Sequence, residues 1–210
     1  MKTSVIIPVK TFQKSKTRLQ LSKEKTEELC ILLLEEVIKT VSKSGLVDKI
    51  IVVTNEVQVS DIIKKYDCKK IQENEETSVN NAVKLAEEYL IEKKFTHSIV
   101  LPLDVPFFYS EDLEKLLKFS SEKSVIIVPS RHFDGTNALV RTPINSMTPR
   151  YDEGSHSYQI ESAKKDNVKI SIGLIYRLML DIDSSEDLEF ALKQNIKPEF
   201  CKKIKKVIEK

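Results

Sequence analysis

Four short runs of apolar residues constrain the fold more than any other feature of this 210-residue chain. The runs are SVIIPV (4–9), KIIVVT (49–54), SIVLPL (98–103) and SVIIVP (124–129). Each has the length of a strand, and none alternates apolar with polar residues as a strand with one wet face does. Uniformly apolar strands are buried on both faces, as in a parallel sheet that helices cover on both sides. The runs therefore predict a mostly parallel central sheet.

Helical patterns fill the intervals between these runs, as the crossover connections of a parallel sheet require. The longest spans 22–43, where Ser22 is placed to cap the first turn and Gly45 to end the helix. Further helices are predicted at 56–66, 77–93 and 110–119, and a short strand at 69–71. This order predicts an α/β fold, a three-layer α/β/α Rossmann-like sandwich with a mostly parallel, mixed sheet.

After residue 130 the regular alternation of apolar runs and helical patterns is less clear. The predicted elements there are a strand at 135–140, a helix at 156–166, a strand at 174–183 and a capped helix at 184–194. The end, CKKIKKVIEK, is predicted to be the solvated face of a last helix with Ile204 and Val207 turned inward, although a phosphate-binding tail is an alternative. No linker divides the chain, so a single domain is expected over 1–210.

Charge and cysteine content argue against several classes of function. Lys and Arg number 34 against 32 Asp and Glu, so no net field points to nucleic acid or an anionic membrane. No apolar run reaches the roughly 18 residues of a membrane span, and MKTSVIIPV is too short for a signal peptide. Cys30, Cys68 and Cys201 lack metal-ligand spacing and are typical of reduced cytosolic thiols. We expect a cytoplasmic protein without nucleic-acid or membrane partners.

The loop after the first predicted strand, KTFQKSKTRLQ, is basic. Lys10, Lys14, Lys16 and Arg18 fall within nine residues, between the strand and a helix. Phosphates bind at such places, where cationic side chains supplement a helix N-terminus. A solvated basic loop is the plain alternative. With only four glycines, the chain has no Gly-x-x-x-x-Gly-Lys or Gly-x-Gly-x-x-Gly motif, which argues against P-loop enzymes and NAD dehydrogenases.

Three aspartates lie at the ends of predicted strands. Asp104 directly follows the run 98–103, and Asp181 and Asp183 belong to LDIDSSED. Ligands of open α/β sheets bind at the carboxyl ends of strands, where these acids could hold Mg²⁺ beside substrate phosphates. Strand termination and helix capping are the alternative for the Asp-x-Asp pair. A basic loop combined with carboxylates that bind a metal indicates phosphoryl or nucleotidyl transfer.

Two later stretches offer small polar groups. RHFDGTNALV contains Thr136 and Asn137, and YDEGSHS contains Gly154 and Ser155 just before a predicted helix. The start of a helix readily receives an anion, which makes Gly154 and Ser155 candidates for binding one, while Thr136 and Asn137 offer polar groups at the start of a predicted strand. Two tight turns are an equally good interpretation of the same letters.

The chain resembles the archaeal 2-phospho-L-lactate guanylyltransferase family in five stretches that occur in the family's order. They are IPVKTFQKSKTRL, LPLDVPFF, VPSRHFDGTNALV, YDEGS and LDIDSSEDL. That family is similar to the bacterial phosphoenolpyruvate guanylyltransferases, and both have the molybdenum-cofactor guanylyltransferase-like nucleotidyltransferase fold. The resemblance implies transfer of GMP from GTP to 2-phospho-L-lactate or phosphoenolpyruvate, with release of pyrophosphate. This would be a step of coenzyme F(420) biosynthesis and would use Mg²⁺.

The resemblance also implies roles for residues in its first motifs and its last. Lys10, Lys16 and Arg18 match the basic loop that grips the GTP phosphates. Lys16 and Arg18, together with Asp104, would be catalytic. The family's metal-binding acids correspond to Asp104, Asp181 and Asp183 in this chain.

For the acceptor, the resemblance points to the two polar stretches. Thr136 and Asn137 match the turn that, with Gly154 and Ser155, holds the phosphate and carboxylate of the three-carbon acid. The residues that match regions near the guanine base are Thr54, Asn55 and Asn80. Residues 1–130 would thus form a nucleotide-binding half, and residues 131–210 a half that binds acceptor and metal.

Three positions depart from the family's usual pattern. Asp152 and Ser78 stand where glycines are usual, and Gln159 stands where a histidine is usual. An extra carboxylate at Asp152 is unfavourable beside an anionic acceptor unless it points away or meets a metal. These changes concern the identity of the acceptor more than the type of reaction.

Rival interpretations have different requirements. A molybdopterin or sugar-phosphate nucleotidyltransferase usually has a glycine-rich loop after its first strand, and PVKTFQKSK has no glycine. A glycosyltransferase of this fold would use Asp181-Ile182-Asp183 to hold the metal of a nucleotide sugar. A non-catalytic nucleotide-binding module would keep the fold without turnover, although the basic loop and three acids argue against it. The sequence allows a homodimer but has no apolar stripe that proves one.

Overall fold

The computed structural model describes residues 2–12, 16–152 and 154–209, and within them the strands form one seven-stranded sheet. The strands are β1 (Thr3–Val9), β2 (Lys49–Thr54), β3 (Lys69–Ile71), β4 (His97–Val100), β5 (Ser124–Pro129), β6 (Thr136–Thr142) and β7 (Lys169–Ile172). Their order across the sheet is β3-β2-β1-β4-β6-β5-β7. Among these strands β6 alone runs antiparallel to its neighbours. The predicted mostly parallel, mixed sheet is confirmed.

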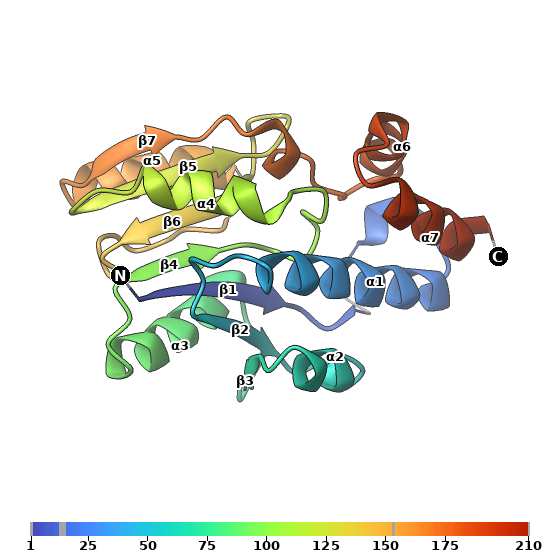
Figure 1. Ribbon diagram of the computed structural model, residues 1–210, viewed down its shortest axis with the longest axis horizontal. Helices are drawn as coiled ribbons and strands as arrows, with labels where there is room; N and C mark the ends of the chain where they lie inside the picture. The colour runs from blue at the N-terminus through green and yellow to red at the C-terminus, as the bar shows by residue number, and fades with distance from the viewer. Residues whose placement is uncertain (1, 13–15, 153, 210) are drawn as a thin grey trace.

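Helices cover both faces of this sheet. They are α1 (Lys23–Val41), α2 (Ser60–Lys65), α3 (Val79–Glu92), α4 (Ser110–Lys118), α5 (Ser155–Lys165), α6 (Ser185–Gln194) and α7 (Pro198–Glu209), with short 3₁₀ turns η2 (Thr17–Leu19) and η3 (Tyr176–Leu178). The apolar residues of α1, α2, α4, α6 and α7 belong to one core, and those of α3 and α5 to the other. Figure 1 shows α1 and α4 in front of the sheet and α5 behind it. This is the predicted three-layer α/β/α fold.

Strand β1 shows why its residues are uniformly apolar. Val5 and Ile7 belong to the core under α1, whereas Ile6 between them belongs to the core under α3. All three side chains are fully buried. Successive side chains of a strand point to opposite faces, so a strand between two helical layers needs an apolar residue at every position. Burial of each such side chain contributes about 1.5–3 kcal/mol to folding.

Serine side chains cap the N-termini of two helices at the positions that the sequence predicted. Ser22 Oγ accepts a hydrogen bond from Lys25 N (3.3 Å) at the start of α1. At α6, Ser184 Oγ accepts from Asp187 N, and Asp187 Oδ2 accepts from Ser184 N, which forms a capping box. The prediction that Gly45 ends the first helix was wrong. The helix ends at Val41 with Ser42 as its right-handed C-cap, and Gly45 lies three residues beyond this cap without a left-handed backbone.

The predicted strand at 174–183 was wrong. The strand of this region is β7, and the segment after it contains η3 and then irregular backbone. Leu178, Leu180 and Ile182 are buried at alternate positions, which imitates the pattern of a strand. The segment has left the sheet, however, because Ile182 N donates to Asp104 O (2.9 Å) in a loop instead of to a neighbouring strand.

Two other elements are shorter than predicted. Strand β4 ends at Val100, although Leu101 N still donates to Ile6 O (2.9 Å), and Pro102 cannot extend the ladder of hydrogen bonds. Helix α2 covers only 60–65 of the predicted 56–66. The last helix begins at Pro198, three residues before the stretch 201–210 from which it was predicted, and the other predicted strands and helices agree with the structure to within two residues at each end.

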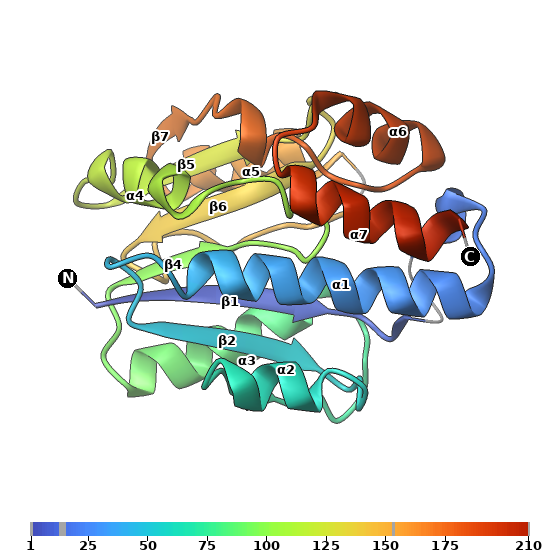
Figure 2. The same cartoon turned by 45° about the vertical axis from the view of Figure 1, so that its right-hand side comes forward.

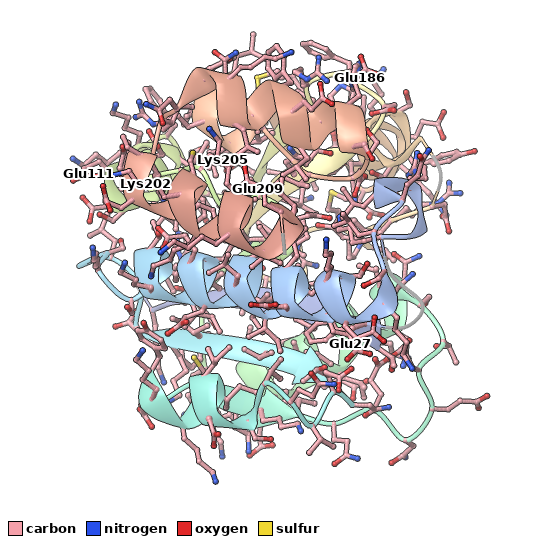
Figure 3. All side chains as sticks on the ribbon, turned by 90° about the vertical axis from the view of Figure 1, so that its right-hand side faces the viewer. Glu27, Glu111, Glu186, Lys202, Lys205 and Glu209 are labelled. Atoms are coloured by element: carbon pink, nitrogen blue, oxygen red, sulfur yellow. The ribbon has the colours of Figure 1, made fainter. Side chains whose placement is uncertain are left out.

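The last helix lies against α1 in both ribbon views (Figures 1 and 2). Ile204 and Val207 are buried against the core, as predicted. The outer face of α7 carries Lys202 and Lys205, which project outward in Figure 3. No helix within the described ranges combines the length and the apolar character that crossing a membrane requires.

Candidate active site

Strands β1 and β4 are neighbours in the sheet. The chain continues from β1 to β2 on one side of this pair and from β4 to β5 on the other side. In α/β sheets such a switch point opens a crevice at the carboxyl ends of the strands. A cavity of about 340 Å³ lies there. Its polar lining comes from Lys10, Lys16, Arg18, Asp104 and Asp183, and its apolar lining from Pro8, Val79, Val100, Pro102, Leu103 and Tyr151. The structure thus brings the predicted basic loop and two of the three predicted acids to one site.

The backbone before and after Asp104 holds this residue at the carboxyl end of β4. The chain leaves β4 at Val100, and Val105 and Phe107 on the far side of the aspartate are fully buried. The carbonyl of Asp104 accepts the hydrogen bond from Ile182 N. This bond joins the segment of Asp181 and Asp183 to Asp104, although some 77 residues separate them in the chain.

The Asp-x-Asp pair is positioned by the buried residue between its members. Ile182 is fully buried, and the two aspartates on either side are partly exposed. Asn137 Nδ2 donates to Leu178 O (3.1 Å) and to Asp181 Oδ1 (3.2 Å). These two bonds join the segment 178–181 to β6. The predicted acceptor residue Asn137 therefore contacts one of the acids directly.

Lys16 lies between the remaining two acids. Its Nζ donates to Asp104 Oδ2 (2.6 Å) and Asp183 Oδ1 (2.5 Å), and its side chain is 8% exposed. Its backbone is left-handed (φ 58°) as the chain turns into η2, which is uncommon for a residue with a side chain. Arg18 Nη2 lies 3.9 Å from Asp183 Oδ2, and its side chain is 77% exposed. Lys14 lies outside the described residues.

The ammonium of Lys16 pairs with Asp104 and Asp183 but not with Asp181, and the pKa values of the cluster reflect this imbalance of charge. Burial and the nearby charge of Asp104 raise the pKa of Asp181 to about 6, against the hydrogen bond from Asn137. Burial also raises the pKa of Asp104, although Lys16 opposes the shift. Burial lowers the pKa of Lys16, but the charges of Asp104 and Asp183 outweigh it and raise the pKa overall. The cluster therefore carries excess negative charge that a further cation would neutralise.

The donor atoms of the cluster suit a hard divalent cation. Carboxylate oxygens are the ligands that Mg²⁺ takes in proteins, usually with substrate phosphates and water. Within the described ranges, however, no three His, Cys, Asp or Glu side chains are arranged to hold a metal ion as they stand. The ammonium of Lys16 fills the space between Asp104 and Asp183. The chemistry of the acids fits a metal, provided that Lys16 moves.

Thr136 and Ser155 come together as predicted. Ser155 Oγ donates to Thr136 Oγ1 (3.1 Å), and both side chains are about 6% exposed. Gly154 precedes α5 with a left-handed backbone (φ 74°), which a glycine adopts without steric cost. The two hydroxyl groups thus lie at the N-terminus of α5, beside Asn137 on the same strand as Thr136. Thr136, Asn137, Gly154 and Ser155 are not among the described residues that line the cavity at the switch point. Of these four, Asn137 is the one whose side chain contacts an acid, Asp181.

The three residues predicted near the guanine base have other partners in the structure. Thr54 Oγ1 accepts from Glu56 N (2.9 Å), and Asn55 Oδ1 accepts from Glu73 N (3.1 Å). Asn80 Oδ1 accepts from Tyr151 N (2.7 Å). Each side chain therefore shapes a loop near the site, and its contact with a base stays a prediction.

The three departures from the family pattern have structural roles. Ser78 caps α3 through a hydrogen bond from Asn81 N (3.1 Å). Gln159 is fully buried and bonds both backbone groups of Arg150. The carboxylate of Asp152 is about half exposed and lies 3.5 Å from Arg150 Nε. This pairing with an arginine lessens the electrostatic conflict that Asp152 would create beside an anion.

Sequence reasoning missed two features of the site. Tyr151 lines the cavity, and its hydroxyl is buried without a hydrogen-bond partner among the residues that the structure describes. The turn before the Asp-x-Asp pair is clamped by Arg177, whose Nε and Nη2 donate to the two carboxylate oxygens of buried Asp112 (2.8 and 2.6 Å). No local pattern could reveal a pair that is 65 residues apart.

Comparisons with known proteins agree with the geometry. The family model described as "Guanylyl transferase CofC like" matches residues 3–209. The chain is 30% identical to the 2-phospho-L-lactate guanylyltransferase of Methanobrevibacter smithii, covering 87% of this chain and 80% of that protein. It is 29% identical to the phosphoenolpyruvate guanylyltransferase of Conexibacter woesei, covering 90% and 86%.

A third curated relative and a solved structure extend the comparison. The 3-phospho-D-glycerate guanylyltransferase of Colwellia psychrerythraea is 30% identical, covering 90% of each chain. The crystal structure of a putative nucleotide-diphospho-sugar transferase from Desulfovibrio desulfuricans superposes with a TM-score of 0.76 at 13% identity, covering 100% of this chain and 98% of that one. The structural likeness shows a shared fold.

Proposed function

The chain belongs to the CofC-like guanylyl transferase family, and on that premise we propose that it transfers GMP from GTP to a phosphorylated three-carbon acid. The acceptor is 2-phospho-L-lactate or phosphoenolpyruvate, and the reaction is a step of coenzyme F(420) biosynthesis in the cytoplasm of an archaeon. The observation that carries the proposal is the meeting of Lys16, Asp104 and Asp183 in the cavity at the switch point of the sheet.

The reaction needs no covalent enzyme intermediate. A phosphate oxygen of the acceptor is already anionic at neutral pH and attacks the α-phosphorus of GTP without a general base. One P–O bond forms, the bond between the α-phosphorus and the bridging oxygen breaks, and pyrophosphate leaves. Lys10, Lys16 and Arg18 attract the GTP phosphates, and Lys16 and Arg18 stabilise the charge that develops on the leaving group. Mg²⁺ held by Asp104, Asp181 and Asp183 would neutralise the two reacting anions.

On the acceptor side, the N-terminus of α5 supplies backbone donors for an anionic group. The hydroxyl groups of Ser155 and Thr136 lie there and can each donate to a phosphate or carboxylate oxygen. Asn137, the neighbour of Thr136 on β6, donates to Asp181 and to the carbonyl of Leu178. Through these bonds it would keep the strand that carries Thr136 aligned with the acids. The three curated relatives carry three different three-carbon acids in their names at 29–30% identity, so identity does not select the acceptor.

Pyrophosphate release tests the proposal. The purified protein is mixed with Mg²⁺ and GTP, ATP, CTP or UTP, each combined with 2-phospho-L-lactate, phosphoenolpyruvate or 3-phospho-D-glycerate. We expect release with GTP and one or both of the first two acids. Release with no combination would contradict guanylyl transfer, and nucleotide-sugar donors would then test a glycosyltransferase of the same fold.

The Ser155→Ala variant tests the acceptor site. Loss of a hydrogen bond to a charged oxygen costs about 1.5–3 kcal/mol, so KM for the acceptor should rise about 10- to 150-fold while KM for GTP stays within twofold. Steady-state assays with each substrate varied in turn measure both constants. Ser157→Ala, on an exposed position of the same helix, is the matched control. Equal increases of both KM values in Ser155→Ala would contradict a specific role in acceptor binding.

A further inference from the structure

Lys16 makes contacts in the free protein that phosphate binding alone does not require. Its ammonium bonds both Asp104 and Asp183, and its side chain is 8% exposed. The carboxylates face the cavity, since Asp104 is 21% and Asp183 42% exposed in their side chains. The single positive charge of Lys16 thus lies between Asp104 and Asp183. Our proposed function assigns these two acids to a divalent cation.

An ammonium and a divalent cation cannot hold these two carboxylates at the same time. Mg²⁺ binds oxygen atoms at about 2.0–2.1 Å in an octahedral arrangement. The ammonium nitrogen is within hydrogen-bond distance of one oxygen of each carboxylate, at the place where a shared metal would lie. Its charge would also repel a second cation a few ångströms away. Metal binding to Asp104 and Asp183 therefore requires that Lys16 leave.

The cavity offers Lys16 an alternative partner when phosphates are present. Lys10 and Arg18 line the same cavity and mark the side where a polyphosphate would be attracted. Phosphate oxygens accept short, charge-assisted hydrogen bonds from an ammonium group. Arg18 cannot replace Lys16 at both acids in the present arrangement, because it is 77% exposed and approaches Asp183 to only 3.9 Å.

We propose that Lys16 is the counter-ion of Asp104 and Asp183 in the free enzyme and that nucleotide phosphates must take up its ammonium before a divalent cation binds these acids. The metal then binds weakly to the free protein and tightly only together with the nucleotide. The assignment of the nucleotide rests on the proposed function, whereas the counter-ion role rests on the contacts of Lys16 alone.

Titration with Mn²⁺ in the absence of nucleotide tests the counter-ion role. Isothermal titration calorimetry should give a dissociation constant for Lys16→Met at least tenfold lower than for the wild type. In EDTA, GTP should bind Lys16→Met at least tenfold more weakly than the wild type. The two effects have opposite signs, whereas a structural role for Lys16 would weaken both. Unchanged or weaker Mn²⁺ binding by Lys16→Met would overturn the proposal.

Matched variants separate the charge of Lys16 from its bulk and its position. Lys16→Arg keeps the positive charge and should bind Mn²⁺ as weakly as the wild type. Lys10→Met should do the same, since no ion pair within the described ranges joins Lys10 to the acids. The double variant Lys16→Met/Asp104→Asn should lose the tight Mn²⁺ site.

A second variant and a second measurement cover a failure of Lys16→Met to fold. Lys16→Gln is then titrated in its place, and in either variant Mg²⁺ should raise the thermal midpoint more than in the wild type. An equal or smaller rise would contradict the counter-ion role. Because no nucleotide is present in the Mn²⁺ titration, failure of guanylyl transfer is detected separately by pyrophosphate release.

Discussion

The Asp104→Asn variant is expected to lose on the order of 10³-fold in kcat/KM for guanylyl transfer while keeping its fold. The asparagine removes one of the charges that would hold the metal and one of the two partners of Lys16, so the preorganised charges around the GTP phosphates are disturbed together. The backbone carbonyl of residue 104 still accepts the hydrogen bond from Ile182 N, because the substitution changes only the side chain. The loop and its neighbours should therefore stay in place.

Pyrophosphate release and circular dichroism measure the two halves of this prediction. Asp61→Asn, an exposed aspartate on α2, is the control and should retain wild-type activity. A thermal midpoint within a few degrees of the wild type would show that Asp104→Asn folds. Near-normal turnover by that folded variant would remove Asp104 from the chemistry, and the role of the acid cluster would have to be abandoned.

The fold could be predicted because its main signals are local. Every residue of β1 is buried, and its central residues are apolar since both faces of the strand meet a helical layer. Ser22 and Ser184 likewise indicate in the sequence where the helices that they cap begin. Prediction failed where long-range contacts override a local pattern. Leu178, Leu180 and Ile182 alternate like a strand, but their burial comes from packing against the core at the end of the sheet.

The candidate site was predicted to a similar extent. The rule that ligands lie at the carboxyl ends of parallel strands placed Lys16 and Asp104 at one edge of the sheet, and both line one cavity in the structure. Asp183 lines the same cavity but comes from irregular backbone, because the strand that was predicted to carry it does not form. The rule does not say which side chains hold loops and which face the cavity. Asn80, predicted near the base, bonds the backbone of Tyr151, and Tyr151 itself carries no signal in the sequence.

The clamp between Arg177 and Asp112 connects the stability of the fold with the geometry of the site. Asp112 has no exposed surface and accepts from Arg177 through both carboxylate oxygens, and also from Tyr109 N (2.9 Å). Arg177 belongs to η3, five residues or fewer before Asp181 and Ile182. The bidentate pair thus fastens the turn that delivers the acids to the cavity.

Replacing Arg177 by Met should lower the free energy of unfolding by about 2–3 kcal/mol, because it leaves the buried Asp112 without its counter-charge. We expect the lower end of the range for broken buried pairs, since the arginine side chain is 34% exposed. Urea denaturation measures the change, and kcat should fall as the acids lose their support. Arg150→Met, which breaks an exposed ion pair with Asp152, should cost less than about 0.5 kcal/mol.

A double-mutant cycle with Asp112→Asn separates the clamp from other effects of Arg177. If the pair acts as a unit, the double variant Arg177→Met/Asp112→Asn should be less destabilised than the sum of the two single variants by about 1–2 kcal/mol. Additive changes, or an Arg177→Met variant as stable as the wild type, would show that the clamp does not hold the segment. The acids would then owe their position to Asn137 and to the bond between Ile182 N and Asp104 O alone.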